Sequence, residues 1–365
     1  MKTIKKAFFA LSCLLFICIL LYNQLSKVDI DINKKHIIAI FIHGTILPIP
    51  SISSFINAIK NKSHKNFFQK YYDDLKTNGE YKSQPIGKIG LEKIKLKENT
   101  DNKINNLISQ IHKQQFLKLN NNNNNIKYSF YSFSWNGRLS KKERINAAEN
   151  LYKELTQEIA KRDMQNIEVY ILAHSHGGNV ALNLALAEDE FKKNLLINKL
   201  ILFGTPVQSE TRNLIHSSIF EKIYHTYSKG DNIQILDNFS TRDFFSQRQF
   251  KNKTKKNFRL PDKLTQIEVI VGNKKPTHCE LWFFGETNLP RYRKNFPIYP
   301  LPLAAISPII IDFIETSIPA LQNSSKDLKL KIEKRNENIY LSAENQISET
   351  IPEKKFTFDS SNLLY

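Results

Sequence analysis

The strongest constraint on the fold is the alternation of short apolar runs with helical patterns along the chain. Six runs have the character of strands, and they cover residues 36–42, 128–134, 167–173, 199–203, 223–227 and 266–271. The first is continuously apolar, which is typical of a strand buried on both faces. Amphipathic helical patterns lie between the runs, and one of them begins at the capping-box pair Ser140 and Glu143. Such alternation predicts an α/β fold, with a mainly parallel sheet, right-handed crossovers and helices on both faces.

The segment 46–126 is too long to be a simple connection between two strands. It contains helix-like patches and ends in an Asn-rich run, so we expect a cap over the strand ends followed by a disordered linker. The last residues, 320–365, are polar, although apolar residues alternate at 328–332 in a way that is compatible with a peripheral hairpin. We therefore expect a main domain at 28–319, a cap insertion at 46–126 and a polar extension at 320–365.

The amino terminus has the pattern of an export signal. Lys2, Lys5 and Lys6 precede an apolar run over residues 7–22, and no small-x-small cleavage site follows it. The run is slightly short for a bilayer core of about 30 Å. We favour an uncleaved signal anchor within residues 1–27 over a cleaved signal peptide, with a buried core helix as the remaining alternative. The positive flank predicts a membrane-anchored body on the periplasmic or lumenal side, or a secreted protein if the signal is cleaved.

The formal net charge of +18 invites a nucleic-acid interpretation. Lys supplies most of the basic charge, however, and the basic residues are scattered along the chain. We expect a solvated Lys-rich surface and no nucleic-acid partner. Of the three Cys, Cys13 and Cys18 lie in the apolar amino-terminal run, which excludes a disulfide framework and a zinc-ligand spacing.

The sharpest motif is the sequence AHSHGG at 173–178, between a predicted strand and a predicted helix. This is the context of a nucleophile elbow, in which a Ser sits on a turn so tight that residues two positions away must be small. Ala173 and Gly177 satisfy that requirement around Ser175. An ordinary turn and a phosphate cradle are the alternatives, but phosphate loops need more Gly and usually a Lys. We therefore predict that Ser175 is a nucleophile.

Acyl transfer also needs backbone donors for the oxyanion. One is expected from the N–H of His176, which follows the nucleophile. The second is expected from Thr45, in the sequence His43-Gly44-Thr45 that closes the first predicted strand. We expect His43 itself to pack under this loop without a catalytic role.

A catalytic triad needs an acid and a base after the Ser in chain order. Asp231 directly follows the fifth predicted strand, and His278 lies in the loop after the sixth. We predict Asp231 as the acid and His278 as the base. Asp237 and His225 are the rivals, although His225 lies inside a strand and precedes the acid. Cys279 is interpreted as a packing residue.

Together, the HGT loop, the AHSHGG elbow, the LFGTPV strand end at 202–207 and the late Asp and His resemble an α/β-hydrolase of the lipase or esterase kind. The resemblance covers roughly residues 36–318, with Ala173 where the family usually has Gly. It implies hydrolysis of an acyl ester without a metal or an organic cofactor.

The apolar loop at 46–50 would suit an acyl-binding wall, with core packing as the alternative, so a hydrophobic ester or lipid is the expected substrate. A non-catalytic scaffold or binding protein with the same fold remains an alternative. So does a thioesterase, amidase or acyltransferase that uses the same triad. The oligomeric state stays open.

Overall fold

A computed structural model describes much of the chain. The described residues are 35–45, 80–81, 84–85, 88–96, 104–120, 125–162, 166–235, 246–251, 259–278, 280–282, 297–298, 303–317, 326–336, 338–345 and 350–357. The expected anchor at 1–27 and the apolar loop at 46–50 lie outside these ranges, as does much of the expected cap.

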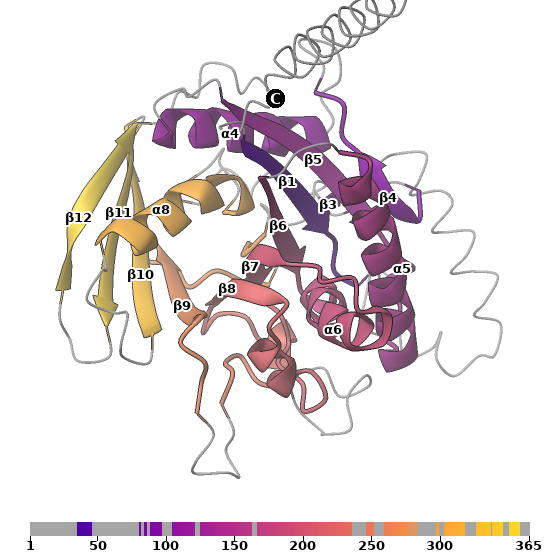
Figure 1. The fold of residues 1–365 in the computed structure, drawn as a ribbon. Coiled ribbons are helices and arrows are strands. Elements are labelled where there is room, and N and C mark those ends of the chain that lie inside the picture. Colours follow the sequence, from indigo (N-terminus) through magenta and orange to yellow (C-terminus); the bar gives the residue numbers. More distant parts are fainter. Residues whose placement is uncertain are drawn as a thin grey trace, which may run out of the picture.

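Within the described residues, a ten-stranded sheet runs through the molecule (Figure 1). Its order is β12 (Thr350–Thr357), β11 (Asn338–Asn345), β10 (Lys326–Arg335), β9 (Leu264–Val271), β8 (Phe220–Tyr227), β7 (Ile197–Phe203), β6 (Ile167–His174), β1 (Lys35–Ile42), β5 (Ile126–Ser134) and β4 (Gly90–Lys93). The seven neighbouring strands β10, β9, β8, β7, β6, β1 and β5 are parallel to one another. At the two ends of the sheet, β4 pairs antiparallel with β5, β11 with β10, and β12 with β11. The short strands β2 (Glu80–Tyr81) and β3 (Gln84–Pro85) form a separate pair. The six predicted strands are all present, as β1 and β5–β9.

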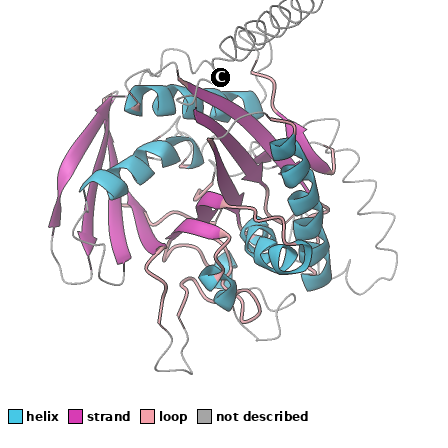
Figure 2. Ribbon diagram, in the orientation of Figure 1, coloured by secondary structure: helices cyan, strands magenta, loops and turns pink. Residues whose placement is uncertain are grey.

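Helices cover both faces of the sheet (Figure 2). One face packs against α5 (Lys141–Ala160) and α6 (His176–Phe191), and the other against α4 (Ile104–Leu119) and α8 (Ser307–Ser317). Along β1, Ile38, Ile40 and Ile42 belong to the first core, while Ala39 and Phe41 belong to the second. Burial on both faces explains why β1 is apolar at nearly every position instead of at alternate ones. The described ranges also contain the 3-10 turns η1 (Arg212–His216), η2 (Ile233–Ile235) and η3 (Ala304–Ile306).

The start of α5 follows the sequence signal in part. Ser140 is the N-cap, and its hydroxyl accepts a hydrogen bond from Glu143 N–H at 3.4 Å. A full capping box would return the Glu143 carboxylate to Ser140 N–H, but that N–H donates to Arg138 O and the carboxylate accepts from Asn136 instead. The helix therefore begins where expected, with one of the two hydrogen bonds of a capping box.

The sheet continues beyond residue 319. Strand β10 pairs in parallel with β9, and its side chains Leu328, Leu330 and Ile332 are buried in the same core as α8. The boundary expected at residue 319 therefore does not coincide with an end of the sheet. The alternation of apolar residues at 328–332 is that of a strand, and β10 also pairs antiparallel with β11.

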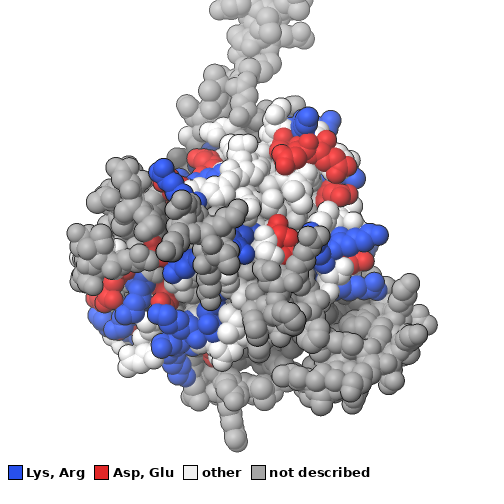
Figure 3. Space-filling model, turned by 90° about the horizontal axis from the view of Figure 1, so that it is seen from below, with Lys and Arg blue, Asp and Glu red and all other residues white. Residues whose placement is uncertain are grey.

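Surface charge is interspersed on the described part of the face shown in Figure 3, where Lys and Arg lie in separate groups with Asp and Glu among them. Several of the described lysines pair with carboxylates, such as Lys35 with Glu168 at 2.6 Å. Across the ranges that the structure describes, no helix is long and apolar enough to cross a membrane.

Candidate active site

Ser175 occupies the turn between β6 and α6 in an unusual backbone conformation, with φ 52° and ψ −129°. A positive φ is uncommon for a residue that carries a Cβ, and it persists only where the surroundings enforce it. Here the Ser175 N–H donates to Phe203 O at 2.9 Å, and the Ser175 carbonyl accepts from Gly178 N–H at 3.0 Å. A Cβ on Gly177 would lie 2.5 Å from His43 O, so the elbow requires Gly there.

The loop that closes β1 lies directly against this elbow. A Cβ on Gly44 would lie 2.8 Å from the Cβ of Ser175, so only Gly lets the two backbones come this close. Thr45 follows Gly44, and its buried hydroxyl has no hydrogen-bond partner among the described residues. His176 is the first residue of α6 and is buried. The assignment of the Thr45 and His176 N–H groups as oxyanion donors stays a prediction.

His43 connects the 43–45 loop to Trp135 through hydrogen bonds and ring stacking. Its Nδ1–H donates to Gly44 O at 2.7 Å, and its Nε2 accepts from Trp135 N–H at 3.1 Å. The indole N–H of Trp135 donates to His43 O at 2.9 Å, and the two rings stack with centroids 5.8 Å apart. Complete burial lowers the pKa of His43 to about 4, so the ring is neutral at physiological pH. Its contacts are those of the packing residue that the sequence suggested.

Ser175, His278 and Asp231 form a continuous chain of hydrogen bonds. Ser175 Oγ lies 2.8 Å from His278 Nε2, and His278 Nδ1 lies 2.7 Å from Asp231 Oδ2. The side chains come from three separate parts of the chain, and all three are buried, with exposed fractions of 6%, 7% and 0% for Ser175, His278 and Asp231. Asp231 can only accept, so Nδ1 of the imidazole carries the proton and Nε2 can accept the hydroxyl proton of Ser175.

The acid is fixed by contacts on its other side. Asp231 Oδ1 accepts a hydrogen bond from Gln234 N–H at 2.9 Å, and the Asp231 carbonyl accepts from Arg248 Nε at 2.9 Å. Room for the pair comes from Gly204, at φ 57°, where a Cβ would lie 3.0 Å from Asp231 Oδ2 and 3.4 Å from His278 Nδ1. The Gly in the LFGTPV strand end is therefore required both by its backbone angle and by the proximity of the acid.

The rival residues are not in this chain of hydrogen bonds. His225 is buried in β8, where its Nε2 donates to Arg248 O at 2.7 Å and burial lowers its pKa to about 4. Asp237 and Cys279 lie outside the described residues. Neither Gln234 nor Arg248 lies in a recognisable motif, because their hydrogen bonds to Asp231 form only in the folded chain.

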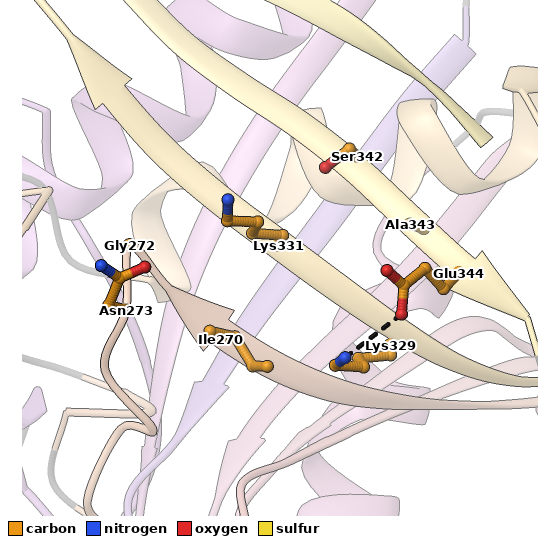
Figure 4. A pocket seen from close by; sticks show the side chains of 8 residues that line it. All are labelled: Ile270, Gly272, Asn273, Lys329, Lys331, Ser342, Ala343 and Glu344. Atoms are coloured by element: carbon orange, nitrogen blue, oxygen red, sulfur yellow. Dashed lines mark hydrogen bonds and ion pairs between the residues drawn. The ribbon is translucent and has the colours of Figure 1, made fainter. Parts of the chain in front are cut away.

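A pocket of about 300 Å³ lies elsewhere, on the outer face of β9, β10 and β11 (Figure 4). Its lining includes Ile270, Lys331 and Ser342, and the ion pair of Lys329 with Glu344 at 3.2 Å crosses it. None of the three residues of the hydrogen-bond chain lines it. Among the described residues, no three His, Cys, Asp or Glu side chains are grouped as ligands for a metal ion.

Comparison with known protein families identifies the family of this chain. A family described as the PGAP1-like alpha/beta domain matches residues 35–244, which is more than half of the 365-residue chain. The chain belongs to this family. The PGAP1-like domain is α/β-hydrolase-like, so the predicted superfamily and fold class are confirmed and the chain is a hydrolase-like α/β protein. The match to the PGAP1-like domain includes Ser175 and Asp231 and ends before His278.

Among solved structures, a crystal structure of a protein assigned as a cell surface hydrolase from Lactobacillus plantarum WCFS1 is similar to part of this PGAP1-like chain. The two share 14% sequence identity, with a TM-score of 0.25, over 54% of this chain and 70% of the other. No curated protein matches the chain significantly.

Proposed function

We propose that the protein is a serine hydrolase that cleaves a carboxylic ester, with a lipid-like substrate, through a Ser-His-Asp triad and an acyl-enzyme. The observation that carries the proposal is the chain of hydrogen bonds from Ser175 through His278 to Asp231, at 2.8 and 2.7 Å. Both distances are within the range that a general base and its orienting acid require.

In the proposed mechanism, Ser175 Oγ attacks the ester carbonyl carbon while His278 Nε2 accepts the hydroxyl proton. The imidazolium then donates that proton to the departing alcohol, which leaves an acyl group on Ser175. Water enters, loses a proton to His278 Nε2 and attacks the acyl-enzyme, which releases the acid and restores the Ser175 hydroxyl. Asp231 keeps the imidazole proton on Nδ1 and stabilises the imidazolium in both halves of the reaction.

The negative charge that develops on the carbonyl oxygen needs donors that are already in place. The N–H of His176, at the amino terminus of α6, is one proposed donor, and the helix dipole favours a negative charge there. The N–H of Thr45 is the second, supported by the approach of Gly44 to Ser175. Removal of one such donor in other enzymes costs about 10²–10³ in kcat.

The preference for a lipid-like ester rests on two sequence features, the apolar loop at 46–50 and the basic-apolar amino terminus at 1–27. An uncleaved anchor would hold the body beside a bilayer, on its periplasmic or lumenal side, where lipid esters are concentrated. The acyl chain would then lie along an apolar wall after the 43–45 loop.

The test is ester turnover by the full chain in mild detergent, over a series of p-nitrophenyl esters of increasing acyl length. We expect turnover that rises with chain length, and a Ser175→Ala variant that stays folded and loses about 10⁴-fold in kcat. His225→Ala is the matched control, because it changes a buried His outside the hydrogen-bond chain. Absence of turnover on esters, thioesters and amides would favour the non-catalytic scaffold. Faster turnover of thioesters, or transfer to an added alcohol, would favour the thioesterase or acyltransferase alternative.

A further inference from the structure

We propose that His174, the residue before the nucleophile, is a positioning residue that ties the elbow to the loop of the catalytic base. The inference rests on the proposed function, because it assigns His278 as the base. His174 is not a member of the predicted triad and takes no part in the proposed proton transfers. Its position at the end of β6 gives it contacts with three parts of the site at once.

The first contact is a hydrogen bond between the elbow and the base loop. His174 Nε2 lies 3.0 Å from His278 O, and the two residues are 104 positions apart in sequence. A carbonyl oxygen can only accept, so His174 Nε2 carries the proton and donates it. The bond acts on the main chain of His278 and leaves both ring nitrogens of the base free for Ser175 and Asp231.

The second contact is ring packing, which fixes the orientation of the donor. The His174 ring lies 4.8 Å from the His278 ring at an interplanar angle of 40°, and it stacks on Trp282 at 5.6 Å and 23°. Trp282 is fully buried and meets Phe203 edge-on at 5.1 Å. His174 is itself 3% exposed, so its ring is held on both sides.

The third contact is with the loop that closes β1. A Cβ on Gly44 would lie 3.2 Å from His174 Nδ1, as well as 2.8 Å from the Cβ of Ser175. His174 therefore lies between the proposed oxyanion loop and the proposed base, directly beside the nucleophile. A group in this place constrains the relative position of all three, and in other enzymes a misplacement of about 1 Å can cost about 10²-fold in rate.

The ring is neutral in this buried environment. Burial, and then the neighbouring His278, lower the pKa of His174 well below its usual value. A neutral ring has one N–H, which the His278 carbonyl takes, and it adds no positive charge beside the imidazolium that His278 becomes in the transition state. The arrangement therefore supports proton transfer without competing for the proton.

The test compares His174→Phe, which keeps an aromatic ring and loses the donor, with His174→Gln, which keeps an N–H close to the position of Nε2. Kinetics on the best p-nitrophenyl ester are measured with the full chain in detergent, together with the melting temperature. We expect His174→Phe to lower kcat by roughly 30-fold with KM within about 3-fold of the unmodified protein, and His174→Gln to recover kcat to within about 5-fold.

His112→Phe is the matched control. His112 is equally buried, and its Nε2 also donates to a main-chain carbonyl, that of Ala304 at 2.6 Å, but its aromatic neighbours are Phe41, Phe116 and Phe130. This variant should lose stability with kcat within about 3-fold of the unmodified protein, because the same bond is lost away from the triad.

Unchanged kcat in His174→Phe, or a His174→Gln variant as slow as His174→Phe, would overturn the inference. An effect on KM alone would also do so. If His174→Phe does not fold, His174→Met replaces it, since Met has the length of Gln and no donor. If Ser175→Ala and His278→Ala lose turnover while His174→Phe keeps it, the inference about His174 fails and the proposed function stands. The proposed function fails if Ser175→Ala keeps turnover.

Discussion

The backbone conformation of Ser175 predicts a stability cost at this position that Gly should relieve. At φ 52° and ψ −129°, a residue with a Cβ occupies a sparsely populated region, which costs about 1–3 kcal/mol. Gly avoids that cost but loses about 0.5–1 kcal/mol more conformational entropy on folding than Ala does. From the middle of these two ranges, Ser175→Gly should be more stable than Ser175→Ala by about 1 kcal/mol. Both variants lose the hydroxyl bond to His278, so that contribution cancels in the comparison.

The assay is urea unfolding of the full-length variants in mild detergent, followed by tryptophan fluorescence and linear extrapolation. The chain has two Trp, Trp135 and Trp282, and both are buried, so their emission reports loss of the core around the site. Ser217 is the matched control, with an ordinary φ of −58°. There the order should reverse, with Gly less stable than Ala by about 0.5–1 kcal/mol. A Ser175→Gly variant no more stable than Ser175→Ala would refute the reasoning that the elbow is strained.

Three further outcomes are expected. Asp231→Asn should lower kcat on esters almost as much as His278→Ala does, with KM little changed. Steady-state kinetics on both variants tests this, and a kcat close to that of the unmodified protein in Asp231→Asn would contradict it. Among the described histidines, burial lowers the pKa to about 4 at His36, His43, His112 and His225, and well below its usual value at His174. Their unfolded forms bind more protons below about pH 6.5, so their contribution to stability is complete above that pH and is lost as pH falls towards 4. Urea titrations near pH 5 should show the slope of the unfolding free energy against pH reduced by about 1.4 kcal/mol per pH unit in His112→Phe, and an unchanged slope in that variant would contradict the assignment. Alkaline extraction of membranes should leave the full-length protein in the pellet, whereas release into the aqueous fraction would exclude an uncleaved anchor at 1–27.

The parts of the fold that the sequence predicts are those with local signals. The apolar run of β1 is buried on both faces, and Gly177 beside the elbow is required because a Cβ there would lie 2.5 Å from His43 O. Chain order and strand ends were enough to select Asp231 and His278, which the structure brings within hydrogen-bond distance of each other. Such residues can be predicted from the sequence because the carboxyl ends of parallel strands lie at the same edge of the sheet.

Other features depend on contacts between distant segments and leave no such signal. The alternation at 328–332 indicates a strand, but nothing in it indicates the pairing of β10 with β9, which lies some sixty residues earlier. His174 looks like one of two His beside the nucleophile, and its hydrogen bond to His278 O connects residues 104 positions apart. Arg248 likewise contacts the main chain of Asp231 from a separate segment. Composition and spacing carry no information on such pairs.

The central claim is that Ser175 is a nucleophile activated by His278. The most direct measurement is covalent labelling of the full chain with a fluorophosphonate probe, followed by mass spectrometry of the labelled peptide. The account predicts a single adduct on Ser175, loss of labelling in Ser175→Ala, and labelling slowed by at least about 10²-fold in His278→Ala, where the general base is missing. His225→Ala, in which a buried His outside the triad is removed, should label at the rate of the unmodified protein. An adduct on another residue, or undiminished labelling of Ser175→Ala, would contradict the claim.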